Sequence, residues 1–561
     1  MQLIECVPNI SEGRDPEVIK QITDVVETVD GVRLLDVDPG KATNRTVITF
    51  VGEPEQVVEA AFLLIQKAAE LIDMSKQTGE HPRMGATDVC PMVPIANISM
   101  EETAKYAHKL GKRVGEELDI PVYCYENAAT SPERTNLANV RAGEYEGLKN
   151  KLTDPEWKPD FGPAAYERAH TTGATAISAR DFLVAYNVNL NTTSTRRANA
   201  IAFDVREKGR VATEGGVLGA KAILDENGQK VWTPGSLKAV KAIGWFIEEY
   251  GVAQISMNLT NIKITSIHEA FDEVADKAHA RGIRVTGSEL VGLVPLNAIL
   301  DAGKYFLKKQ QRSTGISEAE IIKIAVKSLG LDELSPFKPE ERIIEYMLKE
   351  DSDKKLVDMN LVAFADETAS ESPAPGGGSI SAYVGALGIS LGTMVANLSA
   401  HKRGWDDRWE EFSNWADKGE QYKNELIHLV DEDTNSFNMI MNAFRLPKGS
   451  NEEKAIRSKA ISDATKYAIE IPFKVMEAAY NSMEVIKAMA EFGNPNSVTD
   501  AGVGALCART AVMGAFMNVK INCKDLDDKA FVDDIIARGA AIQAKAQALE
   551  TEIVALTESK L

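Results

Sequence analysis

The chain has 561 residues, a formal net charge of -20 and 44% hydrophobic residues. This length predicts roughly three or four domains, and the composition is typical of a soluble globular protein. The negative charge argues against a general nucleic-acid-binding protein, and the short apolar runs predict no membrane span. Five scattered cysteines and an N-terminus without signal-peptide features predict reduced thiols and a cytoplasmic location.

The first half of the chain alternates strand and helix patterns. Short β-branched segments such as VRLLDVDP and NRTVITFVG alternate with helix patterns over 16–29, 54–75 and 101–118. After the Pro-rich connection LTDPEWKPDFGP the alternation restarts, with strand patterns in AQISMNLTNIKIT and IRVTGSELVGLVPL. We therefore expect an α/β (α+β) N-terminal half made of two sheet-and-helix subdomains, over residues 1–175 and 176–325. The Gly-rich polar residues 211–235 are expected to form a surface excursion.

The second half of the chain is helical in pattern. A helical linker is expected over 326–355, followed by an all-α helical bundle over 356–561. Helical periodicity runs through 379–400, 406–444, 452–492, 498–519 and 528–559. The segment SAYVGALGISLGTMVANLSA is dense in small residues, which let helix backbones approach closely. It is expected to be a buried packing helix.

The stretch GEHPRMGATD places His81 before a proline, which disfavours helix and predicts a loop. An imidazole titrates near neutrality and therefore suits general acid–base catalysis. Glu80 or Asp88 could set its tautomer, and Arg83 could hold an anionic substrate through a bidentate contact. The alternative is an ordinary surface histidine.

Carboxylates form three further candidates, each with a structural alternative. Asp36 and Asp38 share one face of a predicted strand, although Asp-Pro-Gly is also strong turn chemistry. In LVDEDTNSF, Asp433 lies four residues before Phe437, on the helix side that Val430, Phe437 and Met441 mark as apolar. It is therefore expected to face the interior and to have a raised pKa, unless the acidic run is simply solvated. Asp500, in GNPNSVTDAGVGAL, falls in a first helical turn, where capping also explains it.

The glycines of SPAPGGGS (372–379) lead directly into the small-residue helix. They expose backbone N–H groups at a helix N-terminus, which favours an anion or carbonyl ligand. The alternative is a flexible linker joined to a close-packed helix.

Taken together, these motifs are specific. ECVPNISEGRD, LLDVDPGKATNRTV, GEHPRMGATDVCPMVP, VRAGEYEGL and GSELVGLVPL resemble the glutamate formimidoyltransferase domain. SPAPGGGSISA, LVDEDTNSFN, GNPNSVTDAGVGA and FMNVKIN resemble formimidoyltetrahydrofolate cyclodeaminase. Their order resembles the bifunctional formimidoyltransferase-cyclodeaminase family of histidine degradation, with the 211–235 excursion as the main departure from its animal form.

The resemblance implies two linked reactions. The formimino group of N-formimino-L-glutamate passes to N5 of tetrahydrofolate, with His81 as catalytic proton shuttle and Asp38 in support. The product is then cyclodeaminated to 5,10-methenyltetrahydrofolate and ammonia, with Asp433 as general acid and Asp500 in support. The folate-binding run of the family falls on ten consecutive residues: Gly162, Pro163, Ala164, Ala165, Tyr166, Glu167, Arg168, Ala169, His170 and Thr171.

The family also implies tetrahydrofolate as co-substrate, usually polyglutamylated, no metal, and a homo-oligomer such as a ring of dimers. Tethering the folate tail while the pterin end visits a second site would raise its effective concentration there. Two alternatives share the same motifs. One is a folate-dependent transferase whose second half is a non-catalytic folate-binding or assembly module. The other is a formyl-transferring one-carbon enzyme.

Overall fold

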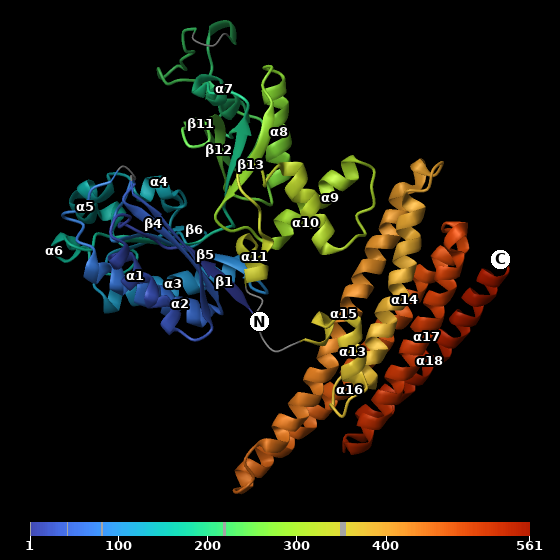
Figure 1. Ribbon diagram of the computed structural model, residues 1–561. Coiled ribbons are helices and arrows are strands. Elements are labelled where there is room, and N and C mark those ends of the chain that lie inside the picture. Colours follow the sequence, from blue (N-terminus) through green and yellow to red (C-terminus); the bar gives the residue numbers. More distant parts are fainter. Residues whose placement is uncertain (1, 42, 80–81, 217–219, 348–354) are drawn as a thin grey trace. The chain divides into compact units, whose positions relative to one another are not determined.

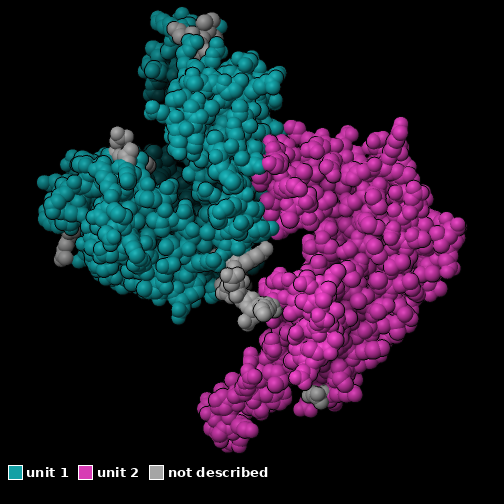
Figure 2. Space-filling view, in the orientation of Figure 1, with its two compact units in different colours: residues 1–302, 329–350 teal, residues 303–328, 351–561 magenta. Residues whose placement is uncertain are grey.

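In the computed structural model, the described residues are 2–41, 43–79, 82–216, 220–347 and 355–561. They group into two compact units, which Figure 2 colours separately: residues 1–302 with 329–350, and residues 303–328 with 351–561. The second unit therefore includes a segment that precedes the bundle in sequence. The bounds of the four segments expected from the sequence stay predictions.

The first unit begins with a mixed sheet that, among the described residues, has seven strands (Figure 1). Its order is β1-β4-β2-β5-β7-β6, with β3 paired to β4, and β5, β7 and β6 run parallel to one another. The strands are β1 (Leu3–Cys6), β2 (Asn9–Ile10), β3 (Val32–Gly40), β4 (Arg45–Gly52), β5 (Thr87–Ala96), β6 (Val122–Glu126) and β7 (Thr175–Ala179). Because β7 belongs to this sheet, the two sheets divide after Ala179.

Helices pack on this sheet through the apolar stripes that the sequence periodicity predicts. Helix α3 begins at a capping box made by Ser99 and Glu102, and α1 begins after Asp15, which caps two backbone N–H groups. Phe50 and Leu64 are fully buried between sheet and helices. The helices are α1 (Pro16–Asp24), α2 (Pro54–Leu71), α3 (Met100–Glu117), α4 (Leu137–Val140), α5 (Glu144–Thr153) and α6 (Tyr166–Ala169).

A second, antiparallel sheet completes the transferase-like half, in the order β11-β12-β8-β13. Helix α7 (Thr195–Val205) and helix α8 (Ile267–His279) pack against it. The predicted excursion contains a short hairpin of β9 (Arg210–Val211) and β10 (Trp232–Thr233). The sheet strands are β8 (Val184–Leu190), β11 (Val240–Ile247), β12 (Val252–Leu259) and β13 (Val285–Val291). Helices α9 (Leu296–Lys309), α10 (Glu318–Leu329), α11 (Pro339–Arg342) and α12 (Ile344–Met347) follow.

The remaining chain is an all-α bundle, which confirms the predicted fold class (Figure 1). Its small-residue helix is buried as expected, because Gly388 lies against Gly504 and Cys507 with no room for a side chain. The helices are α13 (Leu361–Thr368), α14 (Gly377–Ala400), α15 (Trp409–Arg445), α16 (Asn451–Phe492), α17 (Val498–Asn522) and α18 (Lys529–Glu558).

Two helical segments, Gly377–Ala400 and Pro495–Asn522, are long and apolar enough to cross a membrane by length and composition. The bundle buries 61% and 50% of their apolar windows. Core helices of soluble proteins have the same properties, so the finding is weak evidence for a membrane, and the absence of a span stays a prediction. All five cysteines are free thiols, as expected.

Candidate active sites

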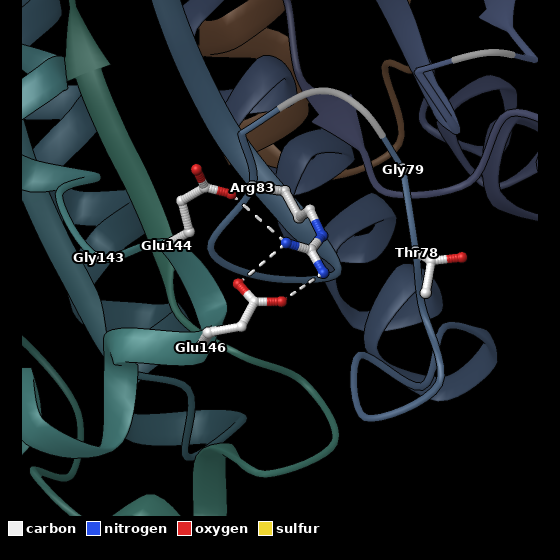
Figure 3. A pocket seen from close by; sticks show the side chains of 6 residues that line it. All are labelled: Thr78, Gly79, Arg83, Gly143, Glu144 and Glu146. Carbon is white, nitrogen blue, oxygen red and sulfur yellow. Dashed lines mark hydrogen bonds and ion pairs between the residues drawn. The ribbon is translucent and has the colours of Figure 1, made fainter.

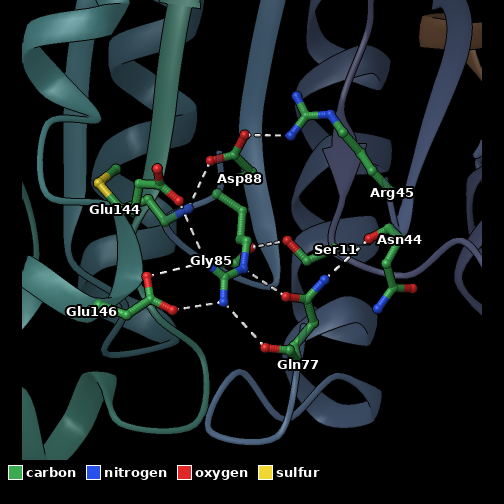
Figure 4. A network of polar contacts seen from close by, with 10 residues as sticks. Ser11, Asn44, Arg45, Gln77, Gly85, Asp88, Glu144 and Glu146 are labelled. Carbon is green, nitrogen blue, oxygen red and sulfur yellow. Dashed lines mark hydrogen bonds and ion pairs between the residues drawn. The ribbon is translucent and has the colours of Figure 1, made fainter. Parts of the chain in front are cut away.

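A polar network holds the described residues on either side of His81, 77–79 and 82–85, which are called the His81 loop below (Figure 4). At the entry, the Asn44 side chain accepts a hydrogen bond from the Gly13 N–H (3.0 Å) and donates to the Thr78 carbonyl (2.9 Å). At the exit, the Ser11 hydroxyl donates to the Gly85 carbonyl (2.7 Å). His81 and Glu80 themselves lie outside the described residues, so the role of His81 stays a prediction.

Asp88 is fully buried and already has partners. Arg45 and Arg141 bind one carboxylate oxygen at 2.5 and 2.9 Å, and the Met84 N–H donates to the other at 2.9 Å. These three contacts give Asp88 a structural role at the start of β5. Because His81 lies outside the described residues, the prediction that Asp88 sets its tautomer stays a prediction.

Arg83 makes the bidentate contact that the sequence suggested, but with the protein itself. Its guanidinium binds both carboxylate oxygens of Glu146, at 2.8 and 3.1 Å, and lies 3.5 Å from Glu144. Its Nε donates to the Gln77 side chain at 2.7 Å, and the ion pair lowers the pKa of Glu146. An anionic substrate would have to displace this ion pair, so the expectation that Arg83 binds one is not supported.

Next to this ion pair lies a cavity of about 480 Å³, which Figure 3 shows from close by. The sequence motif VRAGEYEGL supplies one wall, because Gly143 and Glu144 both have positive φ values and turn the two glutamates toward Arg83. Sequence reasoning missed Glu144 and Glu146, although both lie within a family motif. The lining residues are Thr78, Gly79, Arg83, Gly143, Glu144 and Glu146.

Strand β3, which carries Asp36 and Asp38, ends near this region. The strand continues through Pro39 and Gly40, so Asp-Pro-Gly is not the turn, which falls within residues 41–44 instead. Asp38 is exposed and opposite Val47, and Asp36 has a pKa raised by burial and by the charge of Asp38. Thr43, in that turn, touches Gly79, where the His81 loop begins. Asp38 thus lies on a strand that ends beside the loop.

The run Gly162–Thr171 is held at both ends. Gly162 has a φ of 81° and leaves no room for a side chain against the Ile120 carbonyl. The Thr171 carbonyl accepts a hydrogen bond from the Met74 N–H (2.8 Å), and the next residues pair with Met84 and Ala86 beyond the His81 loop. The end of the predicted folate run and the His81 loop are therefore neighbours.

The middle of this run carries aromatic groups. The His170 ring meets the Tyr166 ring edge-on, with centroids 5.7 Å apart, and the Lys149 ammonium lies 5.8 Å from the Tyr166 ring. The side chain of Arg168 is outside the description, so its predicted contact with a folate carboxylate stays a prediction. Exposed His170 is in a position to meet solvent or ligand.

In the bundle, Asp433 caps the N-terminus of α14. Its Oδ2 accepts hydrogen bonds from the backbone N–H (2.8 Å) and the hydroxyl (3.1 Å) of Ser379. Burial raises the pKa of Asp433, against the opposing effect of these two bonds. The inward orientation and the raised pKa expected from the sequence are both present, and they suit a group that must be protonated to act.

The neighbouring acids of the DED run have separate partners. Asp431 accepts from the Leu356 N–H at 2.8 Å, and Glu432 accepts from the Tyr467 hydroxyl at 2.6 Å. Phe437 and Met441, which were expected to mark a buried side, are 44% and 41% exposed. These two apolar residues therefore lie on an exposed surface of the bundle and not in its core.

Two of the three glycines at the N-terminus of α14 serve the packing of that site. A side chain at residue 378 would overlap the Asp433 carboxylate, and one at residue 377 would press on the Asn518 amide. The glycines are thus required by close approach, while residue 376 is open. Asn518, from the motif FMNVKIN, is a site neighbour that sequence reasoning did not single out.

Asp500 lies in the first turn of α17, as expected, but at the opposite end of that helix from Asn518. At 1.5 Å per residue the two positions are about 27 Å apart. Ser497 is the N-cap residue, yet its side chain caps no backbone group. Within one subunit, Asp500 therefore lies too far away to support Asp433.

No group of three or more His, Cys, Asp or Glu side chains among the described residues is placed to hold a metal ion. That the enzyme needs none stays an expectation.

Sequence comparisons match most of the chain in three parts. The N-terminal subdomain of the formiminotransferase domain matches residues 3–180, the formiminotransferase domain residues 185–349, and formiminotransferase-cyclodeaminase residues 360–541. Formimidoyltransferase-cyclodeaminase of Gallus gallus is 43% identical over 100% of this chain and 99% of its own length.

Relatives of the separate halves also exist. Glutamate formimidoyltransferase of Thermoplasma acidophilum is 44% identical over 55% of this chain and 93% of its own length. Methenyltetrahydrofolate cyclohydrolase of Methylorubrum extorquens is 34% identical over 35% of this chain and 95% of its own length. A solved formiminotetrahydrofolate cyclodeaminase from Thermotoga maritima, 26% identical, covers 36% of this chain and 97% of its own length with a TM-score of 0.33.

Two candidate sites on two unrelated folds, each with its own free-standing relatives, define the chain as a multifunctional folate enzyme. It belongs to the formimidoyltransferase-cyclodeaminase family.

Proposed function

We propose that this chain performs two consecutive folate reactions of histidine degradation. It transfers the formimino group of N-formimino-L-glutamate to tetrahydrofolate and then cyclodeaminates 5-formimidoyltetrahydrofolate to 5,10-methenyltetrahydrofolate and ammonia. The observation that carries the proposal is the 43% identity with a formimidoyltransferase-cyclodeaminase over the whole of both chains. The two sites add chemical support.

In the first reaction, N5 of tetrahydrofolate attacks the formimino carbon, and the bond from that carbon to the glutamate nitrogen breaks. His81 takes the N5 proton and returns a proton to the departing nitrogen. The anchored ends of its loop support this role, because a proton shuttle must be positioned. Asp38 supports the loop from β3, and residues 162–171 hold the folate beside it.

In the second reaction, N10 attacks the same carbon, and the bond from that carbon to its terminal nitrogen breaks. Ammonia is a poor leaving group unless its nitrogen is protonated, so a general acid is required. The Asp433 carboxyl, whose pKa is raised by burial, suits that task.

The folate substrate is expected to carry a polyglutamate tail, which would keep the intermediate near the enzyme between the two sites. The protein is proposed to act in the cytoplasm. Free thiols support that location.

Apolar side chains exposed at helical spacing support a homo-oligomer built through the bundle. Leu387, Met394 and Leu398 of α14 are 38 to 47% exposed, and Val503 and Leu506 of α17 are 48 and 46% exposed. An apolar face on two packed helices favours burial against a second copy. Leu506→Glu should lower the mass measured by light scattering, whereas Leu361→Glu, on α13, should not.

The two roles can be tested separately with chemically prepared 5-formimidoyltetrahydrofolate. His81→Ala should still release ammonia from this intermediate at the wild-type rate, and Asp433→Asn should lose at least about a hundredfold, as for a missing general acid. If Asp433→Asn keeps full ammonia release, the acid is another group.

A further inference from the structure

The two oxygens of the Asp433 carboxyl lie in different surroundings. Oδ2 receives both hydrogen bonds from Ser379, while Oδ1 lies over the Cα of Gly378, in the space that a side chain there would fill. Ser379 is fully buried, and its hydroxyl also lies 2.9 Å from the Val430 carbonyl. The serine is thus fixed to the turn of α15 that precedes Asp433.

This asymmetry decides where a proton can sit. The Ser379 backbone N–H points at Oδ2, and the serine hydroxyl shares its single proton between Oδ2 and the Val430 carbonyl. A proton on Oδ2 would oppose the N–H donor, whereas a proton on Oδ1 does not. We propose that Ser379 is a positioning residue for the deaminase reaction: it engages Oδ2 and directs the acidic proton to Oδ1, the oxygen beside the Gly378 backbone. This inference rests on the proposed role of Asp433.

Among the described residues, the charged groups near Asp433 do not set its acidity in place of Ser379. On its own helix, Asp431 is paired with the backbone of residue 356, and Glu432 with Tyr467 of α16. The first turn of α14 has no acidic residue, and the neighbour from α17 is the neutral Asn518. Ser379 is therefore the group whose removal should change the acidity of Asp433 most directly.

The test measures ammonia release from 5-formimidoyltetrahydrofolate by the full chain across pH. An acid that must be protonated loses activity as pH rises through its pKa. Ser379→Ala removes bonding that stabilises the carboxylate, so the pKa should rise and the alkaline fall in rate should move upward by about one pH unit. The rate should also fall about tenfold because the carboxyl is no longer oriented.

Gly378→Ala is the second variant, since a methyl group there would occupy the space over Oδ1. It should cost ammonia release at least about a hundredfold while glutamate release by the transferase half is unchanged. Ser390→Ala serves as the control, because it removes another α14 hydroxyl that bonds a backbone carbonyl, here Ala386 of the same helix, and is eleven residues from Ser379.

The outcomes separate this inference from the function on which it rests. If Asp433→Asn is inactive but Ser379→Ala keeps the wild-type pH profile, Ser379 is merely structural and the inference fails. If Asp433→Asn is fully active, the role of Asp433 itself is wrong. A rate loss in Ser379→Ala without any shift of the alkaline limb also contradicts the inference.

Discussion

At the scale of single residues, Asp88 shows how the His81 loop is held. This fully buried carboxylate joins Arg45 and Arg141, whose side chains are 10% and 15% exposed. Asp88→Asn would leave two guanidinium groups without their shared anion. Removing one partner of such a buried group costs about 3 kcal/mol. Calorimetry should show a lower melting temperature for the transferase half, whereas Asp24→Asn, in an exposed ion pair, should change it little. An unchanged melting temperature would show that the network does not stabilise the loop.

Glu5, on β1, gives the first unit a pH-dependent stability. Burial raises its pKa to about 7, with Arg180 opposing and Glu345 adding to the shift. A carboxyl with a raised folded pKa takes up a proton on folding, so stability falls as pH rises from about 4.5 to about 7. The fall should be at most about 3 kcal/mol.

Glu5→Gln should therefore match the wild-type melting temperature near pH 5 and exceed it at pH 8. The exposed Glu27→Gln is the matched control and should track the wild type at both values. A Gln variant that is less stable than wild type at pH 8 would show that ionised Glu5 is stabilising.

At the scale of elements, β11 is an edge strand that the protein covers with a side chain. Asn199 of α7 donates to the Gly244 carbonyl (2.9 Å) and accepts from its N–H (3.0 Å), as a neighbouring strand would. Asn199→Ala should cost about 2 kcal/mol, because both backbone groups lose their partner, and should promote aggregation through the opened edge. Thermal melts and light scattering test this against Asn227→Ala in the exposed excursion, and equal behaviour of the two variants would contradict it.

Sequence periodicity predicts the long helices to within a few residues, because their apolar stripes face a core in the single chain. It does not predict β11. Burial alternates along this strand, but the apolar residues Ile243 and Trp245 occupy exposed positions (51% and 38%), so the sequence lacks the polar–apolar alternation of a half-buried strand. Short α7, which begins TRRANA, is missed as well.

In the candidate sites, too, features set by local sequence can be predicted, and features that join distant segments cannot. The inward orientation of Asp433 matches the prediction, although Phe437 and Met441, on which the prediction partly rested, are exposed. The pairing of Arg83 with Glu146 joins residues far apart in the chain, and only the fold brings them together. The distance of Asp500 from Asp433 likewise follows from the antiparallel packing of α14 and α17, which spacing within a motif does not reveal.

At the scale of the whole molecule, two folds with separate sites predict separable activities in one chain. The fusion matters for the intermediate, since a tethered folate reaches the second site at a higher effective concentration than a free one. A substitution that inactivates one site should therefore leave the activity of the other site intact.

The most direct test mixes the full chain with N-formimino-L-glutamate and tetrahydrofolate and follows glutamate, ammonia and methenyltetrahydrofolate absorbance together. The wild type should form all three in equal amounts, His81→Ala none, and Asp433→Asn glutamate with accumulated 5-formimidoyltetrahydrofolate. A wild type that releases glutamate but no ammonia would make the bundle a non-catalytic module. Formation of none of the three products would contradict the account as a whole.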